Sequence, residues 1–288
     1  MLKRALENVL TESEAAEFVS AFDQIGEIVV VRIPDTLLGR RFEIGRALLD
    51  EIKIVRSVFC QASAVDGEYR TRKLELIAGV DDATTTYRES GCRFVVDVEG
   101  AFFSPRLSHE RERIASLVRG GESVLNMFGG IGMFSVIAAM NAACTVYSID
   151  SNPVASKLCE RNVELNEHYG RKNRKKGRKM AGRVIPICGE ASQVVQDRFD
   201  GTCDRTLMLL PERSDEFLGS AVRATADGGV IHYYSHIHSD SKGDAAALSE
   251  RHYLDVAPVR SEILGSRIVR AVGPRYYQTV VDAVIRKG

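Results

Sequence analysis

The chain has 288 residues with 39 basic and 39 acidic side chains, so its formal net charge is zero. Hydrophobic residues make up 44% of it, as in an ordinary globular protein, and no apolar run is long enough to span a bilayer. Because the N-terminus has no apolar signal core and the six cysteines form no C-x-x-C pair, we expect a cytoplasmic protein without a structural metal.

The first hundred residues predict a small α+β domain. Residues 1–25 have a helical charge pattern, and the apolar run 26–34 is typical of a strand that ends at a proline. Residues 40–52 have the spacing of an amphipathic helix, and Phe42 falls on its apolar side. Further strands are predicted at 52–59, 84–88 and 92–98.

The rest of the chain alternates between strand and helix patterns. Ser108 can cap a first helix, and the alternation that follows favours a parallel sheet with helices on both faces. The last strand is predicted to return antiparallel as a hairpin. The expected strands are 123–128, 145–149, 183–188, 204–210, 228–234 and 277–285, with helices near 132–141, 152–166, 190–197 and 212–226.

The most informative motif follows the first strand of this second half. Residues 124–135 read Val-Leu-Asn-Met-Phe-Gly-Gly-Ile-Gly-Met-Phe-Ser, and the next strand ends on Asp150, whose carboxylate can accept hydrogen bonds from ribose hydroxyls. Glycines alone also fit a tight structural turn. The order Gly-Gly-Ile-Gly differs from the dinucleotide pattern and offers few free amides to a pyrophosphate, so the motif favours S-adenosylmethionine. We predict an α/β class I methyltransferase (Rossmann-like) domain, 104–288, after the α+β domain, 1–103.

One segment is strongly basic. Residues 171–183 contain eight lysines and arginines in thirteen positions, between a predicted helix and a predicted strand. The pattern is typical of a loop, and two interpretations remain open. It is either a solvated insertion or an arm that contacts the phosphates of a nucleic acid without reading its sequence.

Five motifs spread over the chain resemble those of the archaeal and eukaryotic Trm5/TYW2 tRNA-modifying enzymes, and the resemblance extends from about residue 26 to 285. It implies a class I S-adenosylmethionine domain joined to a small RNA-positioning domain, without the N-terminal tRNA-elbow domain of longer members. The motifs are Gly-Glu-Tyr-Arg-Thr-Arg (67–72), Phe-Ser-Pro-Arg-Leu-Ser-x-Glu-Arg (103–111), Met-Phe-Gly-Gly-Ile-Gly-x-Phe-Ser (127–135), Ile-Asp-Ser-Asn-Pro (149–153) and Gly-Gly-Val-Ile-His-Tyr-Tyr (228–234).

The resemblance is closest to the Trm5 branch, which methylates N1 of guanosine 37 in tRNA. It implies that Glu110 is the general base and that Arg70 contacts the guanine. From the residues alone, Glu110 is equally an acid that complements a helix dipole, and Arg70 a surface arginine. Two alternatives stay open. One is an aminocarboxypropyl transferase, or a methyltransferase, that acts on a wyosine-pathway base at position 37. The other is a tRNA-binding protein without catalysis.

The resemblance also implies cofactor-binding residues, and the basic segment adds candidate RNA-binding residues. We expect a monomer that binds the anticodon-loop region of tRNA and neither a metal nor a membrane. Two positions depart from the family pattern, because Leu209 replaces an asparagine and Asn126 an acid. The expected cofactor-binding residues are Phe102, Arg111, Phe128, Gly129, Gly130, Ile131, Gly132, Asp150, Ser151, Glu190, Leu209 and Pro211. The expected RNA-binding residues are Arg72, Arg106, Lys172, Arg174, Lys175, Lys176 and Arg178.

Overall fold

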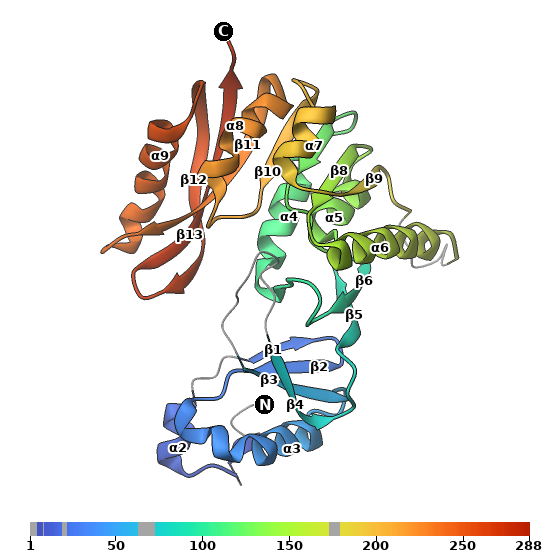
Figure 1. Ribbon diagram of the computed structural model, residues 1–288, viewed down its shortest axis with the longest axis vertical. Coiled ribbons are helices and arrows are strands. Elements are labelled where there is room, and N and C mark those ends of the chain that lie inside the picture. Colours follow the sequence, from blue (N-terminus) through green and yellow to red (C-terminus); the bar gives the residue numbers. More distant parts are fainter. Residues whose placement is uncertain (1–4, 8, 19–21, 63–72, 173–178) are drawn as a thin grey trace. The chain divides into compact units, whose positions relative to one another are not determined.

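A computed structural model describes residues 5–7, 9–18, 22–62, 73–172 and 179–288 (Figure 1). The chain divides into two compact units. The first comprises Met1–Glu89 and Arg93–Pro105, and the second comprises Ser90–Cys92 and Arg106–Gly288. No helix within the described ranges is long and apolar enough to cross a membrane.

The first unit is built on a four-stranded sheet of order β1-β2-β3-β4. β2 and β3 are parallel, because helix α3 crosses between them, and the other two pairs are antiparallel. Ile44 and Leu48 of α3 are fully buried against the sheet. The elements are α2 (Glu12–Glu17), β1 (Phe22–Ile25), β2 (Ile28–Val31), η1 (Asp35–Arg40), α3 (Arg41–Glu51), β3 (Ser57–Gln61), β4 (Leu74–Gly79), and a separate pair, β5 (Thr84–Glu89) and β6 (Cys92–Asp97).

Two predictions for this unit are wrong. Phe42 is 52% exposed rather than core-facing, and the guanidinium of Arg41 lies 4.4 Å from the centre of its ring. The reason is helical geometry, because a residue two positions before Ile44 points roughly 200° away from it. The predicted strand 52–59 begins only at Ser57, after α3 has ended at Glu51.

The second unit contains a seven-stranded sheet of order β12-β13-β11-β10-β7-β8-β9. β7 to β11 are mutually parallel, and β13 is antiparallel to both of its neighbours. The mostly parallel sheet and the final antiparallel strand confirm the predicted class I fold. The strands are β7 (Ser123–Asn126), β8 (Thr145–Asp150), β9 (Arg183–Cys188), β10 (Cys203–Met208), β11 (Thr225–His238), β12 (Arg260–Gly273) and β13 (Tyr276–Arg286).

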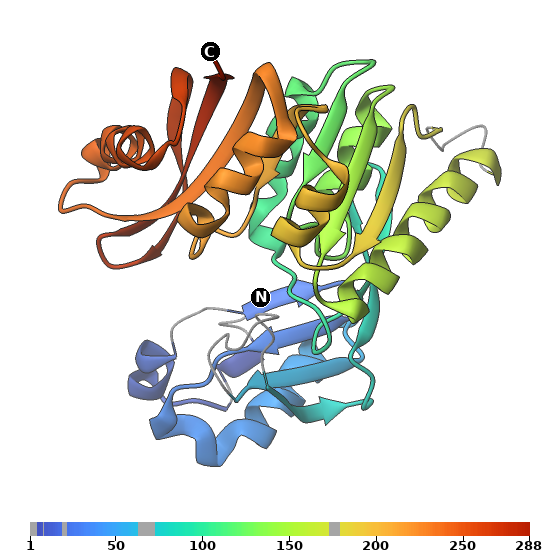
Figure 2. The same ribbon diagram turned by 45° about the horizontal axis from the view of Figure 1, so that its top comes forward.

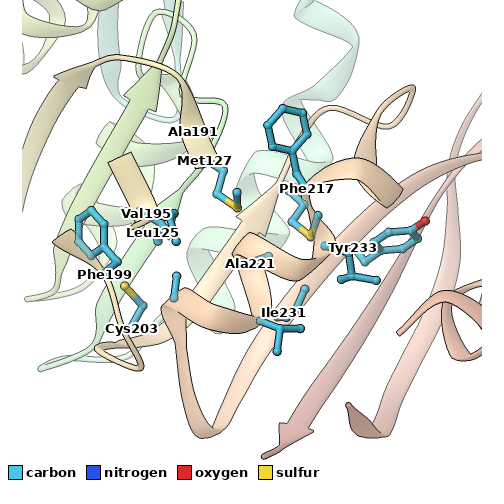
Figure 3. Packing of buried hydrophobic residues seen from close by; sticks show 14 of the residues in the cluster. Leu125, Met127, Ala191, Val195, Phe199, Cys203, Phe217, Ala221, Ile231 and Tyr233 are labelled. Carbon is cyan, nitrogen blue, oxygen red and sulfur yellow. The ribbon is translucent and has the colours of Figure 1, made fainter. Parts of the chain in front are cut away.

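Helices cover both faces of this sheet (Figures 1 and 2). α7, α8 and α9 bury their apolar sides in one cluster with the strands, in which Phe217, Ala221 and Tyr233 are packed together (Figure 3). α4, α5 and α6 pack against one another in succession. The helices are α4 (Ser108–Leu117), α5 (Met133–Asn141), α6 (Pro153–Lys172), α7 (Ala191–Arg198), α8 (Ser214–Ala224) and α9 (Ala245–Val256), with short turns η2 (Pro105–Leu107) and η3 (Lys242–Asp244).

Three sequence predictions are corrected here. Ser108 does not cap α4, because η2 leads directly into the helix and Leu107 occupies the cap position without a side-chain hydrogen bond. Strand β12 was missed, because it forms the sheet edge and the structure leaves none of its residues fully buried, so its sequence lacks an apolar pattern. α6 continues to Lys172, so the start of the basic segment is helical rather than a loop.

Candidate active site at the carboxyl edge of the sheet

The predicted cofactor residues of the second unit follow the carboxyl ends of neighbouring parallel strands. The register pairs Asn126 of β7 with Leu207 of β10 and with Ser148 of β8, so these strands end at one edge. In open α/β sheets this edge is where ligands bind. The glycine turn follows β7, Asp150 and Ser151 end or follow β8, Glu190 follows β9, and Leu209 and Pro211 follow β10.

The glycine turn lies directly against β8. The Gly129 amide donates to the Ile149 carbonyl at 2.6 Å, and the Gly130 amide donates to Asp150 Oδ2 at 2.6 Å. A Cβ atom added to Gly129 would stand 2.1 Å from Ser148 Oγ, so no larger residue fits without a shift. Gly132, with φ of 87°, begins helix α5 in the left-handed region that favours glycine. The turn therefore has the close backbone approach that a nucleoside-type ligand needs.

Buried polar side chains support the glycine turn through hydrogen bonds. Asn126 donates from Nδ2 to Ser135 Oγ at 3.1 Å, and Ser135 donates to Ser148 Oγ at 2.8 Å. Asn162 of α6 donates to the Ile131 carbonyl at 2.9 Å. Asn126, which departs from the family's acid, thus acts as a neutral support whose partners are a serine and the turn itself. Sequence reasoning missed Asn162 and Ser148, because they contact the turn only in the folded chain.

The Asp150 carboxylate is half-buried at the end of β8. It accepts from the amides of Gly130 and Asn152, at 2.6 and 2.9 Å. Burial raises the pKa of Asp150, and the two backbone hydrogen bonds partly oppose that shift. Each carboxylate oxygen carries one of these bonds, so each still has a lone pair that can accept from a ligand hydroxyl.

The remaining predicted cofactor residues of this unit surround the same edge. Phe128 is half-buried and meets Phe217 edge to face, with 5.0 Å between ring centroids. Glu190 is exposed and caps α7 by accepting from the amides of Ser192 and Gln193. Three residues complete the wall: Ile131 and Pro211 are buried, whereas Leu209 is half-buried.

Glu110 lies in the first turn of α4 and is only 2% exposed. Its Oε1 accepts from the Tyr234 hydroxyl at 2.5 Å and from Arg113 at 2.7 Å. The register pairs Tyr233 with Met208, the last residue of β10, so Tyr234 and Glu110 lie at the carboxyl edge too. Burial and the neighbouring Glu110 carboxylate raise the pKa of Tyr234 well above its ordinary value, so the phenol stays a hydrogen-bond donor. The structure thus joins Glu110 to the strand edge that carries the glycine turn.

The structure describes only some of the other predicted site residues. Arg111 is buried, with its guanidinium 5.9 Å from the centre of the Phe134 ring in α5. Phe102 is half-buried in the first unit, and Arg106 is exposed. Of Lys172, only its place in α6 is described. The predicted residues Arg70, Arg72, Arg174, Lys175, Lys176 and Arg178 lie outside the described residues.

Two groups near Glu110, the buried His232 and the half-buried Asp282, predict how stability depends on pH. Burial alone would raise the pKa of Asp282, but hydrogen bonds from His232 and Arg113 lower it to about 2, and burial lowers the pKa of His232. Both groups bind protons more weakly in the folded chain, so their stabilising effect is lost as pH falls below the ordinary values of 6.5 for His232 and 3.8 for Asp282.

The measurement is calorimetric melting between pH 7 and 2. We expect Asp282→Asn to remove the part of the acid loss that wild type shows below its ordinary pKa, on the order of 2 kcal/mol. A variant whose stability falls with the wild-type slope in that range would contradict this assignment.

Comparisons with known proteins assign this architecture to a family. The sequence model of the TRM5/TYW2 methyltransferase domain matches residues 85–247, and that of the TYW2 N-terminal domain matches residues 2–82. The chain is 37% identical to the tRNA (guanine(37)-N(1))-methyltransferase Trm5b of Pyrococcus abyssi, over 91% of this chain and 74% of that protein. It is 33% identical to the tRNA 4-demethylwyosine(37)-methyltransferase Taw21 of Saccharolobus solfataricus, over 90% of this chain and 91% of that protein.

Among solved structures, the complex of aTrm5 and tRNALeu matches with a TM-score of 0.81 at 31% identity, covering 99% of this chain and 78% of that one. The family models, the sequence identities and the structural match all point to the same family. The chain therefore belongs to the TRM5/TYW2 family, close to its Trm5 members.

Proposed function

We propose that this chain is an S-adenosylmethionine-dependent tRNA (guanine-37 N1)-methyltransferase. The observation that carries the proposal is the buried Glu110 carboxylate at the same strand edge as the glycine turn. The names of the similar Trm5b protein and of the Trm5–tRNA complex support the substrate. A cytoplasmic location and a monomeric state stay predictions, which fractionation and light scattering would test.

The residues at the strand edge fit the proposed cofactor. The absent Cβ at Gly129 leaves room for close backbone contact, and Asp150 keeps a lone pair on each oxygen for ribose hydroxyls. The apolar wall formed by Phe128 and Ile131 suits an adenine ring and carries no charge. When bound, the sulfonium supplies an electrophilic methyl group.

Glu110 fits the role of the base. Guanine N1 carries a proton and becomes a good nucleophile only as that proton leaves. Oε1 of Glu110 is engaged by Tyr234 and Arg113, whereas Oε2 has longer contacts, each at 3.2 Å, with Arg113 Nε and Arg267. The Arg267 side chain is 40% exposed and can move aside, so Oε2 is the oxygen that can take the proton. Oε2 of Glu110 would take the N1 proton as N1 accepted the methyl group that the bound cofactor would supply, with the electron pair of the broken C–S bond staying on sulfur.

The direct test is mass spectrometry of tRNA nucleosides. The protein is incubated with S-adenosylmethionine and an unmodified transcript that bears guanosine at position 37, beside a transcript with adenosine there. We expect 1-methylguanosine from the first transcript and no methylated nucleoside from the second. Methylation of both transcripts would place the target elsewhere in the tRNA and contradict the proposal.

A second substrate has a specific observation in its favour. Leu209, half-buried after β10, presents an alkyl side chain that cannot hydrogen-bond a guanine edge, and the Taw21 relative is named as a methyltransferase of 4-demethylwyosine at the same tRNA position. An apolar wall suits a tricyclic base, which has more ring surface to bury. The same assay on tRNA carrying 4-demethylwyosine decides between them: product only from that tRNA would favour the tricyclic base.

The basic segment predicts a contribution to tRNA binding through phosphate contacts. Replacing Lys172, Arg174, Lys175, Lys176 and Arg178 by glutamine should weaken tRNA binding. The slope of log K against log salt should become shallower by about 0.7 for each phosphate that the protein no longer neutralises. Fluorescence anisotropy over a salt series measures both quantities. The matched control replaces five exposed basic residues elsewhere in the second unit: Arg198, Arg223, Lys242, Arg251 and Lys287. Equal slopes in wild type and the segment variant would show that the segment does not contact tRNA phosphates and is a solvated insertion.

A further inference from the structure

A continuous row of buried and half-buried side chains in the second unit begins at the proposed base. It runs beneath α4 and links that helix to strands β13, β11 and β10 in turn. Each member contacts the next within 2.9 Å. The members of this row, which we call the Glu110 row, are Glu110, Arg113, Asp282, His232, Arg205 and Glu122.

Arg113 joins the two carboxylates at the start of the row. Its guanidinium lies 2.7 Å from Glu110 Oε1 and 2.5 Å from Asp282 Oδ2, so its planar fork is fixed from two sides. Burial alone would lower the pKa of Arg113, but the hydrogen bonds to Glu110 and Asp282 raise it above its ordinary value. Arg113 therefore stays charged, and its orientation sets that of the Glu110 carboxylate.

His232 joins the two halves of the row in a single protonation form. Arg205 lies 2.7 Å from its Nε2, and a guanidinium only donates, so Nε2 must be the unprotonated acceptor. The proton is then on Nδ1, which donates to Asp282 Oδ1 at 2.6 Å. Arg205 in turn pairs with Glu122 at 2.8 Å and donates to the Leu117 carbonyl at the end of α4. The row thus ties both ends of α4 to the sheet.

Stability alone does not account for this arrangement. Burying several charges costs desolvation energy that their mutual attraction barely offsets, and apolar packing of the same volume would serve as well. The charged groups add directional hydrogen bonds, and each of these bonds fixes the orientation of the next side chain in the row. His232 also belongs to the 228–234 motif, and the proposed reaction assigns no role to it, although it uses Tyr234 of the same motif.

We propose that Asp282 and His232 are positioning residues for methyl transfer: they lock the Arg113 guanidinium, which holds the Glu110 carboxylate with Oε1 in its short hydrogen bonds and Oε2 in the longer contacts that the target base would replace. The inference rests on the proposed role of Glu110. Neither Asp282 nor His232 touches the substrate in this scheme. Their loss should therefore lower the rate of the chemical step and leave the binding of cofactor and tRNA nearly unchanged.

Two substitutions of His232 separate positioning from packing. An asparagine amide stands where imidazole Nδ1 stands and can donate to Asp282, whereas a glutamine amide reaches the place of Nε2 and can serve only Arg205. His232→Asn should keep the single-turnover rate within about threefold of wild type, and His232→Gln and Asp282→Asn should lower it about tenfold or more. The matched control is Thr279→Val, which removes a buried hydroxyl of the same strand β13 that bonds Ser235 and Ser249 outside the row.

The outcomes that overturn the inference are distinct. If both His232 variants lose rate equally, or Asp282→Asn behaves like Thr279→Val, the row is structural only. Nitrogen-15 NMR of the full chain should show His232 neutral at pH 7 with its proton on Nδ1, and a proton on Nε2 would contradict the row. A wild type that methylates neither tRNA overturns the proposed function and this inference with it. An active wild type with an unaffected Asp282→Asn variant overturns this inference alone.

Discussion

Glu110→Gln lowers the single-turnover rate of methyl transfer to guanosine 37 by about 10²- to 10⁴-fold, the range that a positioned general base contributes. The amide keeps the shape of the side chain and can still accept from Tyr234 and Arg113, whose hydrogen bonds hold the carboxylate now. It cannot accept the N1 proton. Rapid-quench assays with saturating tRNA measure the rate, and equilibrium dialysis should give a cofactor affinity close to that of wild type.

The control for this variant is Glu112→Gln on the same helix. Glu112 is exposed and accepts from Ser90 at 3.1 Å, so the substitution removes the same charge without touching the strand edge. We expect it to keep the wild-type rate. An unchanged rate in Glu110→Gln would show that solvent or another group takes the proton, and the carboxylate would then serve only to anchor α4.

Gly129→Ala abolishes tight cofactor binding and destabilises the second unit by about 1–3 kcal/mol, the cost of forcing atoms into a packed site. The added methyl carbon would stand 2.1 Å from Ser148 Oγ and 3.3 Å from the Ile149 carbonyl, so the turn must move away from β8. That movement breaks the alignment of the Gly130 amide with Asp150. Isothermal titration with S-adenosylmethionine and thermal melting measure the two effects.

Gly219→Ala is the matched control for that substitution. Gly219 lies inside α8, and a methyl group there would meet no atom within 4 Å. Alanine favours a helix over glycine by roughly 0.5–1 kcal/mol, so this variant should melt higher and bind the cofactor as wild type does. If Gly129→Ala binds the cofactor normally, the ligand does not approach the turn as closely as proposed.

The sequence by itself determined the features that depend on neighbouring residues. Alternating apolar runs indicated the parallel strands around β7 and β8, and the glycine pattern after β7 predicted the turn that the structure shows against Asp150. These signals are local, because a strand's apolar run and a glycine's freedom at positive φ are properties of short segments. The family motifs could be recognised in the sequence because each of them is also a short segment. The comparisons confirm the family.

Only the tertiary structure decided which distant groups meet. Tyr234 bonds Glu110, which is 124 residues away in the sequence, and Asp282 bonds Arg113, which is 169 residues away. No periodic pattern in the sequence predicts either contact. The edge strand β12, which carries Arg267, was missed for a related reason, since an edge needs little apolar surface. Local patterns report what each segment tends to form. Contacts between segments depend on sheet order and register, which only the folded chain sets.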